Sequence, residues 1–295
     1  MHEDSIEELM QKVHVLEMKA RKLSRETFAG AYHASFKGQG LDFEDFREYI
    51  HGDEPRFIDW NVTARMNAPF VRTFQEEREL NIIIAVDISG SSIYGSRSLS
   101  KRELAAELTA VLAFTAKLNG DKIGLLLFAG DKELYLPPEK GTKHVLRLIR
   151  EVLATEASQP ATDIAKACQF ITKTVRRKSL IFMLSDFIAY DYSKQIGGLS
   201  KQHDLIAIRL FDPTEQELPD IGQVTLTDPE TNEQRLVNTS NANVRMGYKK
   251  LYTRHFESVQ KIFRQYSIDY CDTSTEEDYL PALYKLFKLR SRRHA

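Results

Sequence analysis

The chain has 295 residues, of which 42% are hydrophobic and 28% charged, and its formal net charge is −1. This composition is typical of a soluble globular protein with one large domain or a domain with an appendage. The near-neutral charge argues against a nucleic-acid-binding protein, which would carry a strongly basic surface. The two cysteines, Cys168 and Cys271, are too few for a disulfide framework, so we expect them to be reduced.

The first ten residues, MHEDSIEELM, are acidic and do not resemble a secretory signal. No apolar run approaches the roughly 20 residues that a membrane-spanning helix needs. We therefore expect a cytoplasmic protein without direct membrane insertion.

Residues 1–79 are predicted to form an amino-terminal segment packed on the main domain. Apolar residues at helical spacing across 5–27 predict an amphipathic helix, and a glycine-containing loop should follow it. The stretch from 36 to 80 has no long helical period, but FVRTFQEE alternates as a strand does. The segment is therefore expected to be one helix followed by a β-rich region.

From residue 80 to about 290, apolar strands alternate with helices. NIIIAVDIS, KIGLLLFAG, SLIFMLSDF and HDLIAIRLFD are continuous apolar runs, as expected of strands buried on both faces. ELYLPP is a shorter strand whose prolines suit a sheet edge. The alternation predicts an α/β fold with a doubly wound, mostly parallel sheet. Such sheets bind ligands beyond the carboxyl ends of their strands.

Residues 213–247 interrupt this alternation. VTLTDPETNEQRLVNT predicts a β-hairpin insertion, with its turn at Asp228-Pro-Glu-Thr-Asn. A helix over 245–266, a strand at SIDYCD and a helix over about 276–290 follow. The basic tail, residues 291–295, is expected to be a frayed, solvated end.

The first buried strand ends in polar residues at every second position, namely Asp87, Ser89 and Ser91. One carboxylate and two hydroxyls offer hard oxygen ligands, which suit Mg²⁺ or Mn²⁺ better than zinc. By itself this spacing is not specific, because serines at strand ends also cap helices.

Two further residues extend this pattern. Thr162 precedes a predicted helix, and Asp186 ends the next buried strand. Each has an ordinary structural explanation, since Thr162 or Asp163 could cap the helix and Asp186 could be a loop acid. Because all the elements fall at strand carboxyl ends or a helix start, we expect the five side chains to converge on one metal ion.

The order D-x-S-x-S, then T-D before a helix, then S-D at a strand end resembles the metal-ion-dependent adhesion site of von Willebrand factor A domains. The resemblance implies that Asp87, Ser89, Ser91, Thr162 and Asp186 bind Mg²⁺ or Mn²⁺, directly or through water. It also implies a coordination position that an Asp or Glu of a partner protein completes.

A second resemblance lies in residues 38–80. This segment is similar to the one that precedes such a domain in bacterial proteins of the domain of unknown function fifty-eight family, although Ile50 and His51 depart from the usual residues. The matching positions are Gly40, Phe43, Arg47, Tyr49, Gly52, Asp53, Arg56, Ile58, Asp59, Trp60, Ala64 and Arg65. Members of that family are commonly paired with MoxR-type AAA+ ATPases, so the resemblance implies such a partner.

The role of Asp53, Arg56, Asp59, Trp60 and Arg65 has two interpretations. They could form a charge-paired network that fixes the segment against the sheet, with Trp60 as an apolar anchor. Alternatively, they could form a recognition surface for a partner.

The sequence favours a non-enzymatic, metal-dependent protein-binding adaptor. One alternative is a metal-dependent phosphatase or hydrolase that uses Asp87, but a dehalogenase-type site needs an acid where Ser89 stands. The chain has no dinucleotide-binding, P-loop or G-x-S-x-G motif. The other alternative is a structural scaffold with a vestigial metal site.

Overall fold

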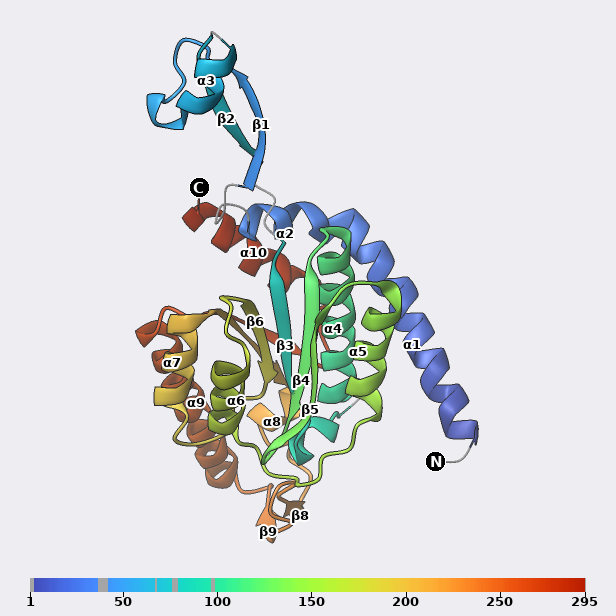
Figure 1. Cartoon of the computed structure of the whole chain (residues 1–295). Helices are drawn as coiled ribbons and strands as arrows, with labels where there is room; N and C mark the ends of the chain where they lie inside the picture. Colours follow the sequence, from blue (N-terminus) through green and yellow to red (C-terminus); the bar gives the residue numbers. More distant parts are fainter. Residues whose placement is uncertain (1–2, 37–41, 67, 76–78, 97–98, 295) are drawn as a thin grey trace.

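A six-stranded sheet forms the centre of the protein in the computed structural model, which describes residues 3–36, 42–66, 68–75, 79–96 and 99–294 (Figure 1). The strand order is β10-β7-β6-β3-β4-β5, and all neighbours are parallel except the pair β4 and β5. The strands are β3 (Asn81–Asp87), β4 (Lys122–Phe128), β5 (Lys132–Glu139), β6 (Leu180–Ser185), β7 (Asp204–Phe211) and β10 (Asp269–Ser274). The predicted mostly parallel sheet, with the proline-containing strand at its edge, is therefore confirmed.

Helices cover both faces of this sheet (Figure 1). Side chains of β3 alternate between two cores, with Ile82 and Ile84 in one and Ile83 and Ala85 in the other. The first core is covered by α1 (Glu3–Leu23), α2 (Ala29–Phe36), α4 (Lys101–Leu118), α5 (Thr142–Ala154) and α10 (Leu280–His294). The second is covered by α6 (Ile164–Thr174), α7 (Ser193–Gln202) and α9 (Ala242–Gln265). Among the described residues, no helix combines the length and apolar character needed to cross a bilayer.

The strand order brings the ends of β3 and β6 together. The chain runs from β3 to β4 on one side and later places β6 on the other side of β3. Val86 pairs with Leu184, so Asp87 and Ser185, the last residues of these two strands, end side by side. This reversal of strand order is where open α/β sheets bind ligands.

The amino-terminal helix is longer than predicted. After α1, a π-helical turn (Ser24–Phe28) leads into α2, which continues through Gly30. The prediction of a loop after residue 27 is therefore wrong. Phe28 and Tyr32 are buried, and the Tyr32 hydroxyl donates a hydrogen bond to Asp121 Oδ2 at 2.9 Å. This tertiary packing outweighs the poor helix propensity of glycine.

A small antiparallel unit follows. It comprises β1 (Asp42–Glu48), a 3₁₀ turn (Pro55–Phe57), α3 (Trp60–Met66) and β2 (Phe70–Gln75). Figure 1 shows it standing beyond the amino ends of the parallel strands, at the opposite end of the molecule from the β8–β9 hairpin. Gly40, part of the matched sequence pattern, lies outside the described residues.

The interpretation of Trp60 as an apolar anchor does not hold, because its side chain is 69% exposed, and the alternative of a recognition surface stays open. Asp59 is buried and accepts hydrogen bonds from the amides of Asn61 and Val62, which caps α3. Val71 on β2 is a buried apolar residue of this unit. Arg47 forms an exposed bidentate pair with Asp53, with N–O distances of 2.7 Å, so a charge pair that stabilises the unit is present.

The predicted hairpin insertion is present as β8 (Gln223–Thr227) and β9 (Gln234–Asn238), next to the short helix α8 (Pro213–Gln216). Figure 1 places it at the carboxyl ends of the parallel strands. The basic tail, predicted to be frayed, continues α10 as a helix as far as His294. Arg290 holds this helix in place, because its guanidinium bonds to Asp204 and Asp269, which begin β7 and β10.

The Tyr32–Asp121 hydrogen bond predicts a measurable effect on stability. Tyr32→Phe should lower the free energy of unfolding by about 1–2 kcal/mol, because it leaves a buried carboxylate without one donor. Urea unfolding would measure this, with Tyr190→Phe as a control, since Tyr190 is 83% exposed. Equal effects of the two substitutions would show that the contact does not tie α2 to the sheet.

Candidate metal centre

The loop after β3 is folded tightly by its own polar groups. Asp87 Oδ1 accepts a hydrogen bond from the Ser89 amide at 3.0 Å, and the Ser92 hydroxyl donates to the Ser89 carbonyl at 2.7 Å. A 3₁₀ turn (Gly90–Ile93) follows directly. Asp87 and Ser89 are buried, so these contacts fix their side chains at the carboxyl edge of the sheet.

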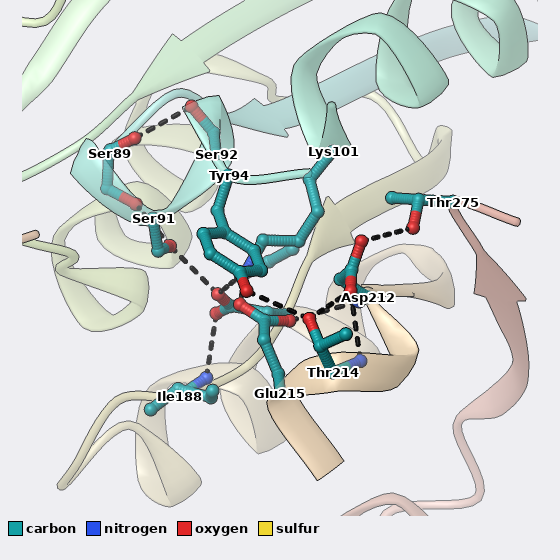
Figure 2. A network of polar contacts seen from close by, with 12 residues as sticks. Ser89, Ser91, Ser92, Tyr94, Lys101, Ile188, Asp212, Thr214, Glu215 and Thr275 are labelled. Carbon is teal, nitrogen blue, oxygen red and sulfur yellow. Dashed lines mark hydrogen bonds and ion pairs between the residues drawn. The ribbon is translucent and has the colours of Figure 1, made fainter. Parts of the chain in front are cut away.

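This loop is joined to the end of β6 by side-chain hydrogen bonds (Figure 2). The hydroxyls of Ser89 and Ser91 lie 3.3 Å apart, and the Ser91 hydroxyl donates to Asp186 Oδ2 at 2.8 Å. Ser185 donates to Asp87 Oδ2 at 2.6 Å. The structure therefore brings four of the five predicted ligands, Asp87, Ser89, Ser91 and Asp186, into one hydrogen-bonded cluster.

The backbone turns sharply after Asp186, and hydrogen bonds hold the carboxylate of that residue. Phe187, the next residue, has φ of 58°, a left-handed conformation that costs about 1 kcal/mol or more outside glycine. It is maintained by the Phe187 amide, which donates to Ser185 Oγ, and by the buried ring, which packs edge-on against Phe263. The Ile188 amide donates to Asp186 Oδ1 at 3.0 Å, so the other carboxylate oxygen is left for Ser91.

Thr162, the fifth predicted ligand, bonds to a residue that the sequence did not suggest. Its hydroxyl donates to Glu230 Oε1 at 2.6 Å, and its amide donates to Glu230 Oε2 at 3.2 Å. Helix α6 is capped by Asp163, whose side chain accepts from the Lys166 amide. Thr162 is therefore not the helix cap. The Gly90 amide donates to the Pro160 carbonyl at 2.8 Å, so the Thr162 loop adjoins the serine loop.

A buried lysine lies beside the cluster. Lys101, the first residue of α4, is 2% exposed, and its ammonium is 2.7 Å from Asp186 Oδ2 and 2.6 Å from Glu215 Oε1 (Figure 2). A cation in the first turn of a helix opposes the helix dipole, so these two carboxylates are what stabilise it there. A positive charge thus already binds the Asp186 oxygen that faces the two serines.

The two aspartates respond differently to burial. Burial and the negative charge of Asp186 raise the pKa of Asp87 from its ordinary value of 3.8 to about 6. Burial opposes ionisation of Asp186 as well, but the Lys101 ammonium outweighs it and holds the pKa of that carboxyl below its usual range. Once Asp87 ionises, the carboxylates of Asp87, Asp186 and Glu215 still outnumber the two cations beside them, Lys101 and the Arg102 guanidinium that acts on Asp87.

These residues fit a small divalent cation. The clustered donors are carboxylate and hydroxyl oxygens, which Mg²⁺ and Mn²⁺ accept, and the excess negative charge favours a dication. The described part of the chain has no group of three or more His, Cys, Asp or Glu side chains suited to a metal. The candidate set differs from such a group because it combines two acids with three hydroxyls.

Three residues of this region were not identified from the sequence. Lys101 had a detectable signal, because the Ser100–Glu103 capping box places a lysine where the helix dipole disfavours it. Glu215 belongs to a second capping box that begins at Asp212, after β7. Glu230 had no local signal, because its position depends on how the hairpin folds back over the sheet edge.

Stability without metal should depend on pH through Asp87. Its folded-state pKa lies above the ordinary value, so the folded protein binds a proton that the unfolded chain releases between pH 3.8 and about 6. In EDTA, the unfolding free energy of the wild type should therefore fall relative to Asp87→Asn as pH rises through this window. Chemical denaturation would measure the difference, with Asp131→Asn at an exposed aspartate as control. If the unfolding free energies of the wild type and Asp87→Asn differ by the same amount throughout this pH range, the raised pKa of Asp87 is contradicted.

The chain is similar to mycobacterial proteins over almost its full length. It is 28% identical over 284 residues to "Uncharacterized protein Rv1480" of Mycobacterium tuberculosis, covering 95% of this chain and 89% of that protein. It is 27% identical over 159 residues to "Uncharacterized protein MAV169" of Mycobacterium avium, covering 52% of this chain and 94% of that protein.

Two solved structures from Bacteroides match 72% of this chain and 99% of their own. They are a conserved hypothetical protein BatB from Bacteroides thetaiotaomicron, at 18% identity and a TM-score of 0.46, and an aerotolerance-related membrane protein from Bacteroides fragilis, at 16% identity and a TM-score of 0.47.

The model of the family described as "Protein of unknown function DUF58" matches residues 45–258. That range contains all five candidate ligands and the hairpin insertion. The chain belongs to the DUF58 family.

Proposed function

We propose that this protein is a metal-dependent protein-binding adaptor that presents Mg²⁺ or Mn²⁺ to an acidic side chain of a partner. The observation that carries the proposal is the hydrogen-bonded cluster that joins Ser89 and Ser91, after β3, to Asp186, after β6. In this proposal Asp87, Ser89, Ser91, Thr162 and Asp186 hold the ion. The ion supplies a positive charge and an exchangeable coordination position when it is bound.

The proposal includes a fold assignment. We propose that residues 80–290 form a von Willebrand factor A-type domain within the broader Rossmann-like class. The strand order, with its reversal between β3 and β6, supports it, and so do the residues at that reversal. The partner is proposed to be a MoxR-type AAA+ ATPase by family resemblance, and the site of action the cytoplasm.

Binding is favoured over hydrolysis because Ser89 stands where a dehalogenase-type phosphatase needs an acid, and its hydroxyl lies 3.3 Å from that of Ser91. A scaffold with a vestigial site would not need two buried aspartates and the strained Phe187 beside them. Phosphatase turnover with Mg²⁺ that Asp87→Ala abolishes would overturn the binding proposal.

Metal binding should be measurable by calorimetry. Wild-type protein should bind Mn²⁺ and Mg²⁺, and Ser89→Ala should weaken binding by at least about tenfold, since even outer ligand partners cost about 10- to 100-fold in metal affinity. Ser291→Ala on α10 is the control, because its hydroxyl bonds to the Lys288 carbonyl, away from the proposed ligands and their partners. Absence of heat in all three proteins would favour the scaffold alternative.

A second test concerns the partner. Capture of a MoxR-type ATPase by the wild type should weaken when EDTA is added and also when Asp87 is replaced by alanine. The reason is that a metal-bridged contact needs both the ion and the ligand that neutralises it. Asp131→Ala controls for loss of a surface charge. Capture that is unchanged under both conditions would rule out a metal-bridged interaction.

A further inference from the structure

We infer that Glu230, in the turn of the β8–β9 hairpin, is an internal acidic ligand of this site, occupying the coordination position that a partner's carboxylate would take. The inference rests on the proposed metal site and names a residue that regulates it. The β8–β9 hairpin, through Glu230, then competes with the partner's carboxylate for the metal ion.

The contacts of Glu230 support this role. Both of its carboxylate oxygens bond to Thr162, one to the hydroxyl at 2.6 Å and one to the amide at 3.2 Å. The side chain is half-buried, and the negative charge of Asp186 acts on it. The Glu230 carboxylate therefore comes from a distant part of the chain, bonds to Thr162, and is repelled by the charge of Asp186.

The hairpin turn is shaped to deliver this carboxylate. Asp228 Oδ1 accepts hydrogen bonds from the amides of Glu230 and Thr231, which fixes the backbone beside Glu230. The Pro229 carbonyl lies so close to Gly90, between the two serines, that a Cβ at Gly90 would be 2.2 Å from the carbonyl oxygen. Glycine at position 90 thus lets the turn lie directly against the serine loop.

This arrangement has a consequence for partner binding. A carboxylate tethered within the same chain competes at an effective concentration on the order of millimolar or above. A free carboxylate of similar intrinsic affinity is therefore excluded, and a partner must contribute additional contacts to displace the hairpin. The β8–β9 hairpin is then the element that opens when the partner binds.

Water-proton relaxation with bound Mn²⁺ tests the inference, because relaxation rises with the number of water molecules on the ion. Glu230→Gln should weaken Mn²⁺ binding by about tenfold and raise the relaxation per bound ion, since water replaces the carboxylate. Added acetate should lower the relaxation of Glu230→Gln towards the wild-type value and leave the wild type unchanged. Glu233→Gln, at an exposed acid of the same hairpin, should behave as wild type.

Glu230→Ala should reproduce the effects of Glu230→Gln, and circular dichroism would verify that both variants are folded. The inference is overturned if Mn²⁺ binds all the proteins with the same affinity, relaxation and insensitivity to acetate, because Glu230 would then only fasten the hairpin to Thr162. Failure of Mn²⁺ to bind even the wild type would overturn the proposed metal site itself, and this inference with it.

Discussion

The burial of two aspartates at one edge of the sheet is the constraint on which the candidate metal centre depends. Asp87 and Asp186 lie at the ends of neighbouring parallel strands, where little solvent reaches them. Two carboxylates in such a place destabilise the fold unless cations and hydrogen-bond donors offset their charge. Lys101 compensates Asp186, whereas Asp87 has the Ser185 hydroxyl and the Ser89 amide but an elevated pKa. The fold thus maintains a negative charge that a dication would relieve.

The sheet determines where this charge is placed. Parallel strands buried on both faces hold their carboxyl ends rigidly, and the reversal of strand order leaves room for loops from β3 and β6 to meet. The insertions are then divided between the two ends of the molecule (Figure 1). The β1–β2 unit with its exposed Trp60 lies beyond the amino ends, and the β8–β9 hairpin with Glu230 lies at the candidate centre. A partner that contacts the centre must therefore meet the hairpin.

The sequence predicted those site residues that lie close together along the chain. Asp87, Ser89 and Ser91 leave one strand at alternating positions, and apolar runs mark the strands, so both the loop and the sheet edge could be predicted. Glu230 and Lys101 reach the site from other elements, and their approach depends on tertiary packing that no local pattern encodes. The helix through Gly30 was missed because buried contacts of Phe28 and Tyr32 outweigh propensity. Of the two interpretations of Trp60, the apolar anchor does not hold, because the indole is exposed and Asp59 is the buried residue at the start of that helix.

The most direct test of the metal centre is a crystal structure of the protein grown with Mn²⁺ and measured at the manganese absorption edge. The proposed site predicts an anomalous peak about 2.1 Å from the hydroxyls of Ser89 and Ser91, close to the distance at which Mg²⁺ binds oxygen. It further predicts that Asp87 and Asp186 lie beside that peak. A structure with full manganese in the solvent, no anomalous peak there, and Ser91 still bonded to Asp186 would contradict it.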